Sequence, residues 1–252
     1  MLGKLIGKPG WDWAVFGKHP VAKDYFQINL TSPMAHAFAK WVDTGFQRLS
    51  EDERRRRVCS WRFWSKGQKR GATLCGLGKS SSDSIGRPYP MMIIGEGELD
   101  EWESYWHLML FGLGPTWEAL EYTATRRLKS LDQLESDINQ METPGRQWQQ
   151  ARQHTGNQLN DEHSAWLKKK IILSDVREKV KALITDGQLF IPIGGNGVED
   201  PFQLAGAWHL ALKECHAPIP NTVFMGGSPE KTLLAFYCRP LAPDDFSVLW
   251  SV

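Results

Sequence analysis

The sequence has no apolar run that approaches the ~20 residues needed to cross a bilayer, so no membrane-inserted helix is expected. It also lacks an excess of either charge sign, because 30 lysine and arginine residues stand against 29 aspartate and glutamate residues. Such a balanced chain has no long-range field to attract a polyanion, which argues against nucleic acid as its main partner. The first residues carry neither a long apolar stretch nor a small-residue cleavage site, so no secretory signal peptide is expected.

Cysteine is scarce. The four cysteines are Cys59, Cys75, Cys215 and Cys238, and no two of them form a CxxC pair. All but Cys215 sit in apolar, strand-like runs. This usage is typical of reduced, mostly buried thiols, and it favours a cytoplasmic protein over a secreted, disulfide-bonded one.

Motifs for catalysis, cofactors and metals are also missing. The glycine loop 194–197 lies between an expected strand and helix, but it has neither the GxxxxGK[ST] nor the GxGxxG pattern. The serines 80–82 stand outside any GxSxG motif and have no recognisable base. His209, Cys215 and His216 lie near one helix, yet no second cluster completes a metal site. We therefore expect no catalytic residue, no cofactor and no metal.

What the chain does contain is the composition of an ordinary globular protein, with 41% hydrophobic and 23% charged residues. Its 12 tryptophans indicate a well-filled core, and a few exposed ones could mark an interaction face. Alternation and apolar runs predict strands at 13–16, 26–30, 58–64, 72–78, 90–94 and 189–193, and a hairpin over 222–238. Helical spacing predicts helices at 33–49, 99–127, 131–141, 166–184, 201–215 and 243–249.

These elements favour an α/β fold in which a central, mostly antiparallel or mixed β-sheet is flanked by helices on both faces, a three-layer sandwich. We expect one domain over 1–252, with 130–188 as a helical insertion that contains a polar connection at 144–160. Gly112, Gly114 and Pro115 are expected to break or kink the helix that contains them.

A charge run, EDERRRR, occupies residues 51–57. A nucleic-acid or localisation tract would need its positive charge to dominate, but the acidic residues beside it cancel much of the field. The run is interpreted as a solvated helix end or loop.

Two stiff loops combine unlike charges. The first, GKHP at 17–20, continues to Asp24, and the second, SSSDSIGRPYP, spans 80–90. In the second loop the prolines fix φ and remove backbone donors, and the glycine permits a tight turn before a buried strand. Asp83 and Arg87 stand close enough in sequence to pair. Either the pair only fixes the fold, or the loops form a ligand or partner site.

Several segments together resemble the TagF family, also called ImpM, accessory proteins of bacterial type VI secretion. FGKHP at 16–20 followed by DYF at 24–26 is similar to its opening motif, and SWRF at 60–63 to its WRF strand. SSDSIGRPYP at 81–90 is similar to its SxDxxGRxxPL signature, and 222–228 and 241–246 resemble its closing segments. Lys23 stands where the family has Gly, and Met91 where it has Leu.

The resemblance implies a cytoplasmic, non-enzymatic accessory protein that acts after translation, as a repressor, by binding a component such as the FHA-domain scaffold of the secretion system. We expect protein binding or loop bracing by residues from both loops and from the WRF strand: Lys18, Asp24, Ser81, Asp83, Arg87, Trp61 and Trp64. One alternative is a phosphate- or nucleotide-binding sensor or enzyme that uses loops 80–90 and 194–197. The other is a structural subunit of the secretion apparatus.

Overall fold

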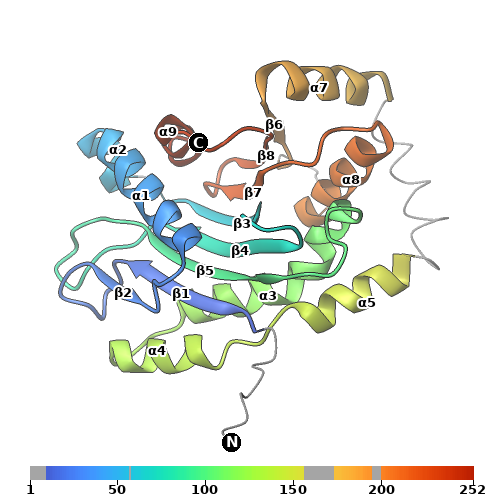
Figure 1. The fold of residues 1–252 in the computed structure, drawn as a ribbon. Helices are drawn as coiled ribbons and strands as arrows, with labels where there is room; N and C mark the ends of the chain where they lie inside the picture. Colours follow the sequence, from blue (N-terminus) through green and yellow to red (C-terminus); the bar gives the residue numbers. More distant parts are fainter. Residues whose placement is uncertain (1–9, 57, 156–172, 195–199) are drawn as a thin grey trace, which may run out of the picture.

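The computed structural model describes residues 10–56, 58–155, 173–194 and 200–252. Its centre is one eight-stranded sheet with the order β2-β1-β5-β4-β3-β7-β8-β6, in which every neighbouring pair is antiparallel (Figure 1). The strands are β1 (Asp12–Gly17), β2 (Phe26–Ile28), β3 (Ser60–Lys66), β4 (Ala72–Lys79), β5 (Met91–Glu98), β6 (Gln188–Pro192), β7 (Thr222–Gly227) and β8 (Thr232–Tyr237). The predicted meander of β3, β4 and β5 is confirmed.

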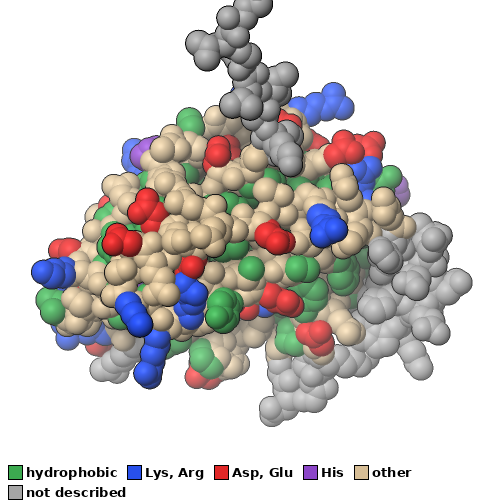
Figure 2. Space-filling view, turned by 90° about the horizontal axis from the view of Figure 1, so that it is seen from below, with side chains coloured by type: hydrophobic (Ala, Val, Ile, Leu, Met, Phe, Trp, Pro, Cys, Tyr) green, Lys and Arg blue, Asp and Glu red, His purple; other side chains and the backbone are tan. Residues whose placement is uncertain are grey.

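Helices cover both faces of the sheet, so the predicted three-layer architecture is confirmed (Figure 1). On one face lie α1 (Pro33–Arg48) and α9 (Pro243–Trp250), with the short α2 (Glu51–Arg56) beside α1. The other face carries the 3-10 turn η1 (Trp106–Leu108) and the helices α3 (Met109–Thr125), α4 (Leu131–Asn139), α5 (Gly145–Thr155), α7 (Leu173–Asp186) and α8 (Pro201–Glu214). Figure 2 shows acidic and basic side chains interspersed over the face seen from below.

Helix α1 starts where the sequence predicts. The Ser32 side chain accepts a hydrogen bond from the Ala35 backbone N–H at 3.0 Å, and Pro33 occupies the first helical position. The apolar residues of this helix recur at helical spacing and are buried against the sheet. The capping residue therefore fixes the register that turns this stripe toward the core.

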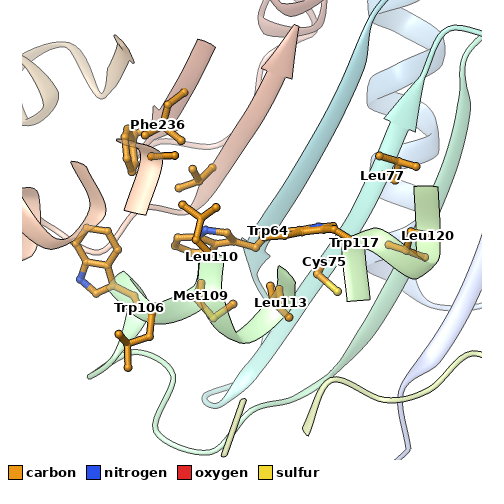
Figure 3. Packing of buried hydrophobic residues seen from close by; sticks show 14 of the residues in the cluster. Trp64, Cys75, Leu77, Trp106, Met109, Leu110, Leu113, Trp117, Leu120 and Phe236 are labelled. Atoms are coloured by element: carbon orange, nitrogen blue, oxygen red, sulfur yellow. The ribbon is translucent and has the colours of Figure 1, made fainter. Parts of the chain in front are cut away.

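Strand alternation gives the sheet two separate cores. Trp61 and Phe63 of β3 face α1 and α9, whereas Trp64 faces α3. Figure 3 shows the side chains of Leu113 and Trp117 from α3 beside Trp64 and the strand β4. The indole of Trp117 also donates a hydrogen bond to the Gly76 carbonyl at 3.1 Å, which ties α3 to the middle of the sheet.

The predicted helix break at Gly112, Gly114 and Pro115 does not occur, because α3 continues through all three residues. The long helix predicted over 99–127 instead starts at residue 109, after turns and η1. Gly112 has a packing reason: a Cβ there would lie 2.7 Å from the ring of Trp148. The glycine thus allows α5 to approach α3 closely.

The polar connection predicted over 144–160 is also wrong in its first part, where α5 forms. Only one large apolar side chain marks this helix, Trp148, and it is fully buried. Its indole donates a hydrogen bond to the Asp100 carbonyl at 2.8 Å. A single tryptophan thus anchors a helix whose other side chains are mostly polar, which is why composition suggested an exposed segment. Residues 156–160 lie outside the described part of the chain.

We expect Trp148→Ala to lower the free energy of unfolding by about 3–5 kcal/mol, because it leaves a cavity beside Gly112. The carbonyl of Asp100 also loses one of its two hydrogen bonds and keeps the one from Arg152 at 3.2 Å. Urea unfolding measures the change. The exposed neighbour Gln149 supplies the matched control, and Gln149→Ala should stay within about 0.5 kcal/mol of the wild type. Equal effects of the two substitutions would contradict the assigned packing of α5.

Candidate functional site

The two charged loops leave the same end of the sheet (Figure 1). The first follows β1 and the second joins β4 to β5, and β5 lies between the other two strands. The pairing sets Gly17 of β1 and Lys79 of β4 on either side of Met91, the first residue of β5. Antiparallel pairing therefore places two loops side by side although they lie more than fifty residues apart in sequence.

Asp83 is the centre of the contact between the loops. The residue is 2% exposed, and its side chain accepts from Lys18 Nζ at 3.0 Å and from Arg87 Nε at 2.7 Å, both at Oδ2. The other oxygen, Oδ1, accepts from the backbone N–H groups of Ile85 at 3.2 Å and Arg87 at 2.9 Å. One carboxylate thus closes the turn of its own loop and binds the cation of the other.

A second layer of contacts surrounds this centre. Asp24 lies 3.7 Å from Lys18 Nζ and 3.1 Å from the Arg87 guanidinium, and that guanidinium also donates to the Lys23 carbonyl at 3.0 Å. The Ser84 backbone N–H donates to the Ala22 carbonyl at 2.8 Å. The loops are therefore joined by ion pairs and by backbone hydrogen bonds, and we call the pair the twin loops.

The charges shift one another's proton affinity. Burial alone would raise the pKa of Asp83, but the hydrogen bonds from Lys18, Arg87 and Ile85 outweigh it and hold that pKa far below its ordinary value. The pKa of Asp24 is lowered chiefly by the Tyr25 backbone N–H, with Arg87 and Lys18 adding to the effect. Both carboxylates are therefore ionised at neutral pH.

Two glycines shape the twin loops for different reasons. Gly17 has φ +122°, and a Cβ built on it would lie 2.0 Å from the Pro90 carbonyl oxygen, so the loops touch backbone to backbone there. Gly86 has φ +84° at the tip of its turn, where a Cβ would meet nothing within 4 Å. The first glycine is needed for space and backbone together, the second for backbone alone.

The outer side of the twin loops exposes apolar side chains beside the charges. Ile85 is 73% exposed at the tip of its turn, and Tyr25 is 40% exposed and packs edge-on against Tyr89. Together with Asp24 and Arg87 they form what we call the twin-loop surface. Charged residues of this surface were predicted, whereas Ile85 and Tyr25 were missed, because sequence alone does not show which loop residues point outward.

The structure therefore brings together four of the predicted site residues, Lys18, Asp24, Asp83 and Arg87. Ser81 lies beside them half-buried, and its carbonyl accepts from the Tyr89 backbone N–H at 3.0 Å.

The prediction that Trp61 and Trp64 belong to this set is wrong. Trp61 is 0% and Trp64 1% exposed, on opposite faces of β3. Each indole fills a core between the sheet and its helices, so neither belongs to an exposed surface.

A cleft of about 950 Å³ lies beside the twin loops, bounded by α2, the end of β4 and the chain after α3. Its cationic lining was missed by the sequence reasoning, although the charge run at 51–57 contributes to it. The run was interpreted as a solvated helix end or loop, and its residues 51–56 form the separate short helix α2.

The alternative that joins loops 80–90 and 194–197 around one phosphate is not supported by the fold. Gly194 follows β6, the strand at the far edge of the sheet, and packs against Thr232. Four strand spacings separate β4 from β6, which is about 19 Å. A single phosphate cannot contact both loops across that distance. Residues 195–197 lie outside the described part of the chain.

Among the residues that the structure describes, no group of three or more His, Cys, Asp or Glu side chains could hold a metal ion. His209 is fully buried, and its Nδ1 lies 2.8 Å from the Ala205 carbonyl. Within the same ranges, every helix is too short or too polar to traverse a bilayer.

The difference in stability between Asp83→Asn and the wild type should depend on pH. At pH 7 the variant should melt at a lower temperature, because Lys18 and Arg87 lose their shared carboxylate. The pKa of Asp83 is lower in the folded protein than the ordinary 3.8 of the unfolded chain. As pH falls below that ordinary value, the unfolded wild type takes up a proton that the folded protein does not, so the wild type loses this stability and the variant does not.

Thermal unfolding from about pH 7 to about pH 3 measures this difference. Asp12→Asn, at an exposed position of β1, is the control and should follow the wild type throughout. A gap between the wild type and Asp83→Asn that stays constant over the whole range would contradict the assigned role.

The two glycines should respond differently to alanine. Gly86→Ala should cost about 1–2 kcal/mol of unfolding free energy, the backbone penalty for an L-residue at positive φ. Gly17→Ala should cost more, because its Cβ also collides with the Pro90 carbonyl. Urea unfolding of both variants makes the comparison, and a smaller cost at Gly17 would show that the loops do not meet there.

The sequence profile of the TagF N-terminal domain, described as type VI secretion system-associated, matches residues 14–141, just over half of the chain. A search of the curated protein sequences gives no match. Among solved structures, the chain is similar to the crystal structure of PA0076 from Pseudomonas aeruginosa PAO1, with 15% identity and a TM-score of 0.53. That alignment covers 94% of this chain and 93% of the other, and at such low identity it shows a common fold alone.

The profile match contains both twin loops, from Gly17 to Pro90, and the WRF strand. On this match the chain belongs to the TagF N-terminal domain family and is associated with type VI secretion.

Proposed function

We propose that this protein is a non-enzymatic, cytoplasmic accessory factor that represses type VI secretion by binding a protein of the machinery through its twin-loop surface. The partner proposed is the FHA-domain scaffold protein of the system. The observation that carries the proposal is the exposed Ile85 at the tip of a loop that two ion pairs to the buried Asp83 carboxylate hold in place.

Rigidity is what makes this surface suitable for docking. An exposed isoleucine on a mobile loop would lose conformational entropy on binding, and that loss would reduce the affinity. Here the Asp83 carboxylate fixes the turn before any partner arrives. Arg87 lies two residues after the isoleucine, and the exposed Tyr25 packs against Tyr89 of the same loop. Arginine and tyrosine are enriched at the energetic centres of protein interfaces.

The charges of the surface also support a protein partner. Arg87 is half exposed although it pairs with Asp83 and Asp24, so part of its guanidinium remains accessible to a partner. Asp24 is more exposed still. A surface with one apolar tip and neighbouring charges of both signs is typical of a specific, reversible protein interface.

Ile85→Asp should weaken capture of the purified FHA-domain scaffold protein at least about tenfold, because a charge replaces the central apolar contact. The melting temperature should not change, since the Ile85 side chain is 73% exposed. Ile184→Asp is the matched control: Ile184 is 64% exposed on α7, away from the twin loops, and its substitution should leave capture intact.

Surface plasmon resonance with the immobilised scaffold measures capture, and Arg87→Ala tests the adjoining charge. Equal binding by the wild type and Ile85→Asp would exclude the twin-loop surface as the docking site. Failure of the wild type itself to bind would exclude the scaffold as the partner.

A further inference from the structure

The cleft beside the twin loops carries positive charge from three separate segments. Arg54 and Arg55 come from α2, Lys79 ends β4, and Arg126 and Arg127 follow α3. No acidic side chain lies among the described residues that line it. The positive and negative charges of the whole chain nearly cancel, so the cationic lining gives this cleft a local positive potential.

Three of these cations are already engaged. Arg55 pairs with Glu51 at 2.7 Å, and Arg126 pairs with Asp137. The Arg54 guanidinium donates to the Phe46 carbonyl at 3.1 Å, at the C-terminal end of α1. Such contacts fix the three guanidinium groups in position.

The other two cations are not neutralised. Among the residues that the structure describes, Lys79 Nζ donates only to the Ala124 carbonyl, at 3.3 Å. Arg127 is exposed and pairs with no carboxylate among the described residues. The nearest acid that influences Lys79 is Glu121, and its two oxygens accept from the Arg62 guanidinium at 2.8 Å each.

Burial lowers the pKa of Lys79 despite the opposing influence of Glu121. The pKa of His19, which also lines the cleft, is lowered too, first by burial and then by the charge of Lys79. The cleft therefore holds a half-buried ammonium that forms no ion pair with a described carboxylate, and an anion entering the cleft would stabilise its charged form.

The rest of the lining indicates which anion fits. Val58 is 67% exposed, and Val21 and Leu128 add apolar surface. The hydroxyls of Ser81 and Ser82 are not engaged by other described side chains. Cations spread over three segments, with apolar surface between them, suit an extended peptide better than a single phosphate, which needs donors that converge on one point.

We propose that the cleft binds an acidic segment of the protein partner, with its carboxylates at Lys79 and Arg127 and its apolar side chains against Val58 and Leu128. This inference rests on the proposed function, since it supplies the chemistry of the segment that binds next to the twin-loop surface. The occupant is a glutamate- and aspartate-bearing peptide with apolar residues between its acids.

Fluorescence anisotropy tests the cleft directly with the full chain and a short fluorescein-labelled peptide of glutamate, leucine and glycine. The wild type should bind this peptide, bind its lysine-for-glutamate counterpart at least about tenfold more weakly, and lose affinity as salt is added. Arg127→Glu should weaken binding at least about tenfold. Lys79→Gln should weaken it less, because the change removes a charge without reversing it.

Lys181→Glu, the same charge reversal at an exposed position on α7, is the matched control and should bind as the wild type does. Melting temperatures identify any variant that fails to fold, and Arg127→Glu is the informative one because its side chain is exposed. Equal weakening by Arg127→Glu and Lys181→Glu would overturn the proposal.

Competition separates the possible occupants. Inorganic phosphate that displaces the peptide at low concentration would assign the cleft to phosphate, and a single-stranded oligonucleotide that does so would assign it to nucleic acid.

The Ile85→Asp variant distinguishes failure of the cleft proposal from failure of the docking proposal. If Ile85→Asp abolishes scaffold capture and Arg127→Glu leaves the peptide affinity unchanged, the cleft proposal fails and the docking proposal stands. If Arg127→Glu weakens peptide binding and Ile85→Asp leaves scaffold capture unchanged, the docking proposal fails and an acidic-peptide site remains.

Discussion

The buried carboxylate of Asp83 is the contact on which the organisation of this end of the molecule depends. It accepts from two cations of opposite loops and from two backbone N–H groups of its own loop. Removing a carboxylate from water is unfavourable unless most of its lone pairs are hydrogen-bonded, and here four donors meet that requirement. The geometry of both loops follows from this condition, because all four donors must converge on one buried group.

This arrangement suits specificity better than stability. An apolar cluster of the same volume could hold two loops together at least as strongly, since burying charges is costly. An ion pair with fixed directions instead selects one relative placement of the loops. Such a placement keeps Ile85 outside and Asp83 inside, and it leaves the Arg87 side chain half exposed.

Much of the fold could be predicted from the sequence where the signals are local. Ser32 and Pro33 marked the start of α1, short connections indicated the β3-β4-β5 meander, and the spacing of Asp83 and Arg87 suggested a pair. Short-range patterns succeed because the interactions behind them act within one turn or one hairpin. The family resemblance supplied the association with type VI secretion, which no local pattern contains.

The rest could not be predicted because it depends on tertiary packing. Strand alternation predicted a strand over 58–64, but only the helices on both sides of the sheet bury Trp61 and Trp64. Trp148 looked isolated in a polar segment until Gly112 of another helix provided its site. Similarly, Arg54 in the charge run borders a cleft only because the end of α3 also lines it.

The pairing of β3 with β7, which completes the sheet, joins segments far apart in the sequence. The family profile ends at residue 141, after α4, so it contains β3 but not β7, the strand that pairs with β3. In a relative with this fold, the chain after that position must still supply a strand beside β3 and cover its aromatic side chains. Without such a strand, β3 would be an exposed edge whose unpaired backbone groups could pair with another chain.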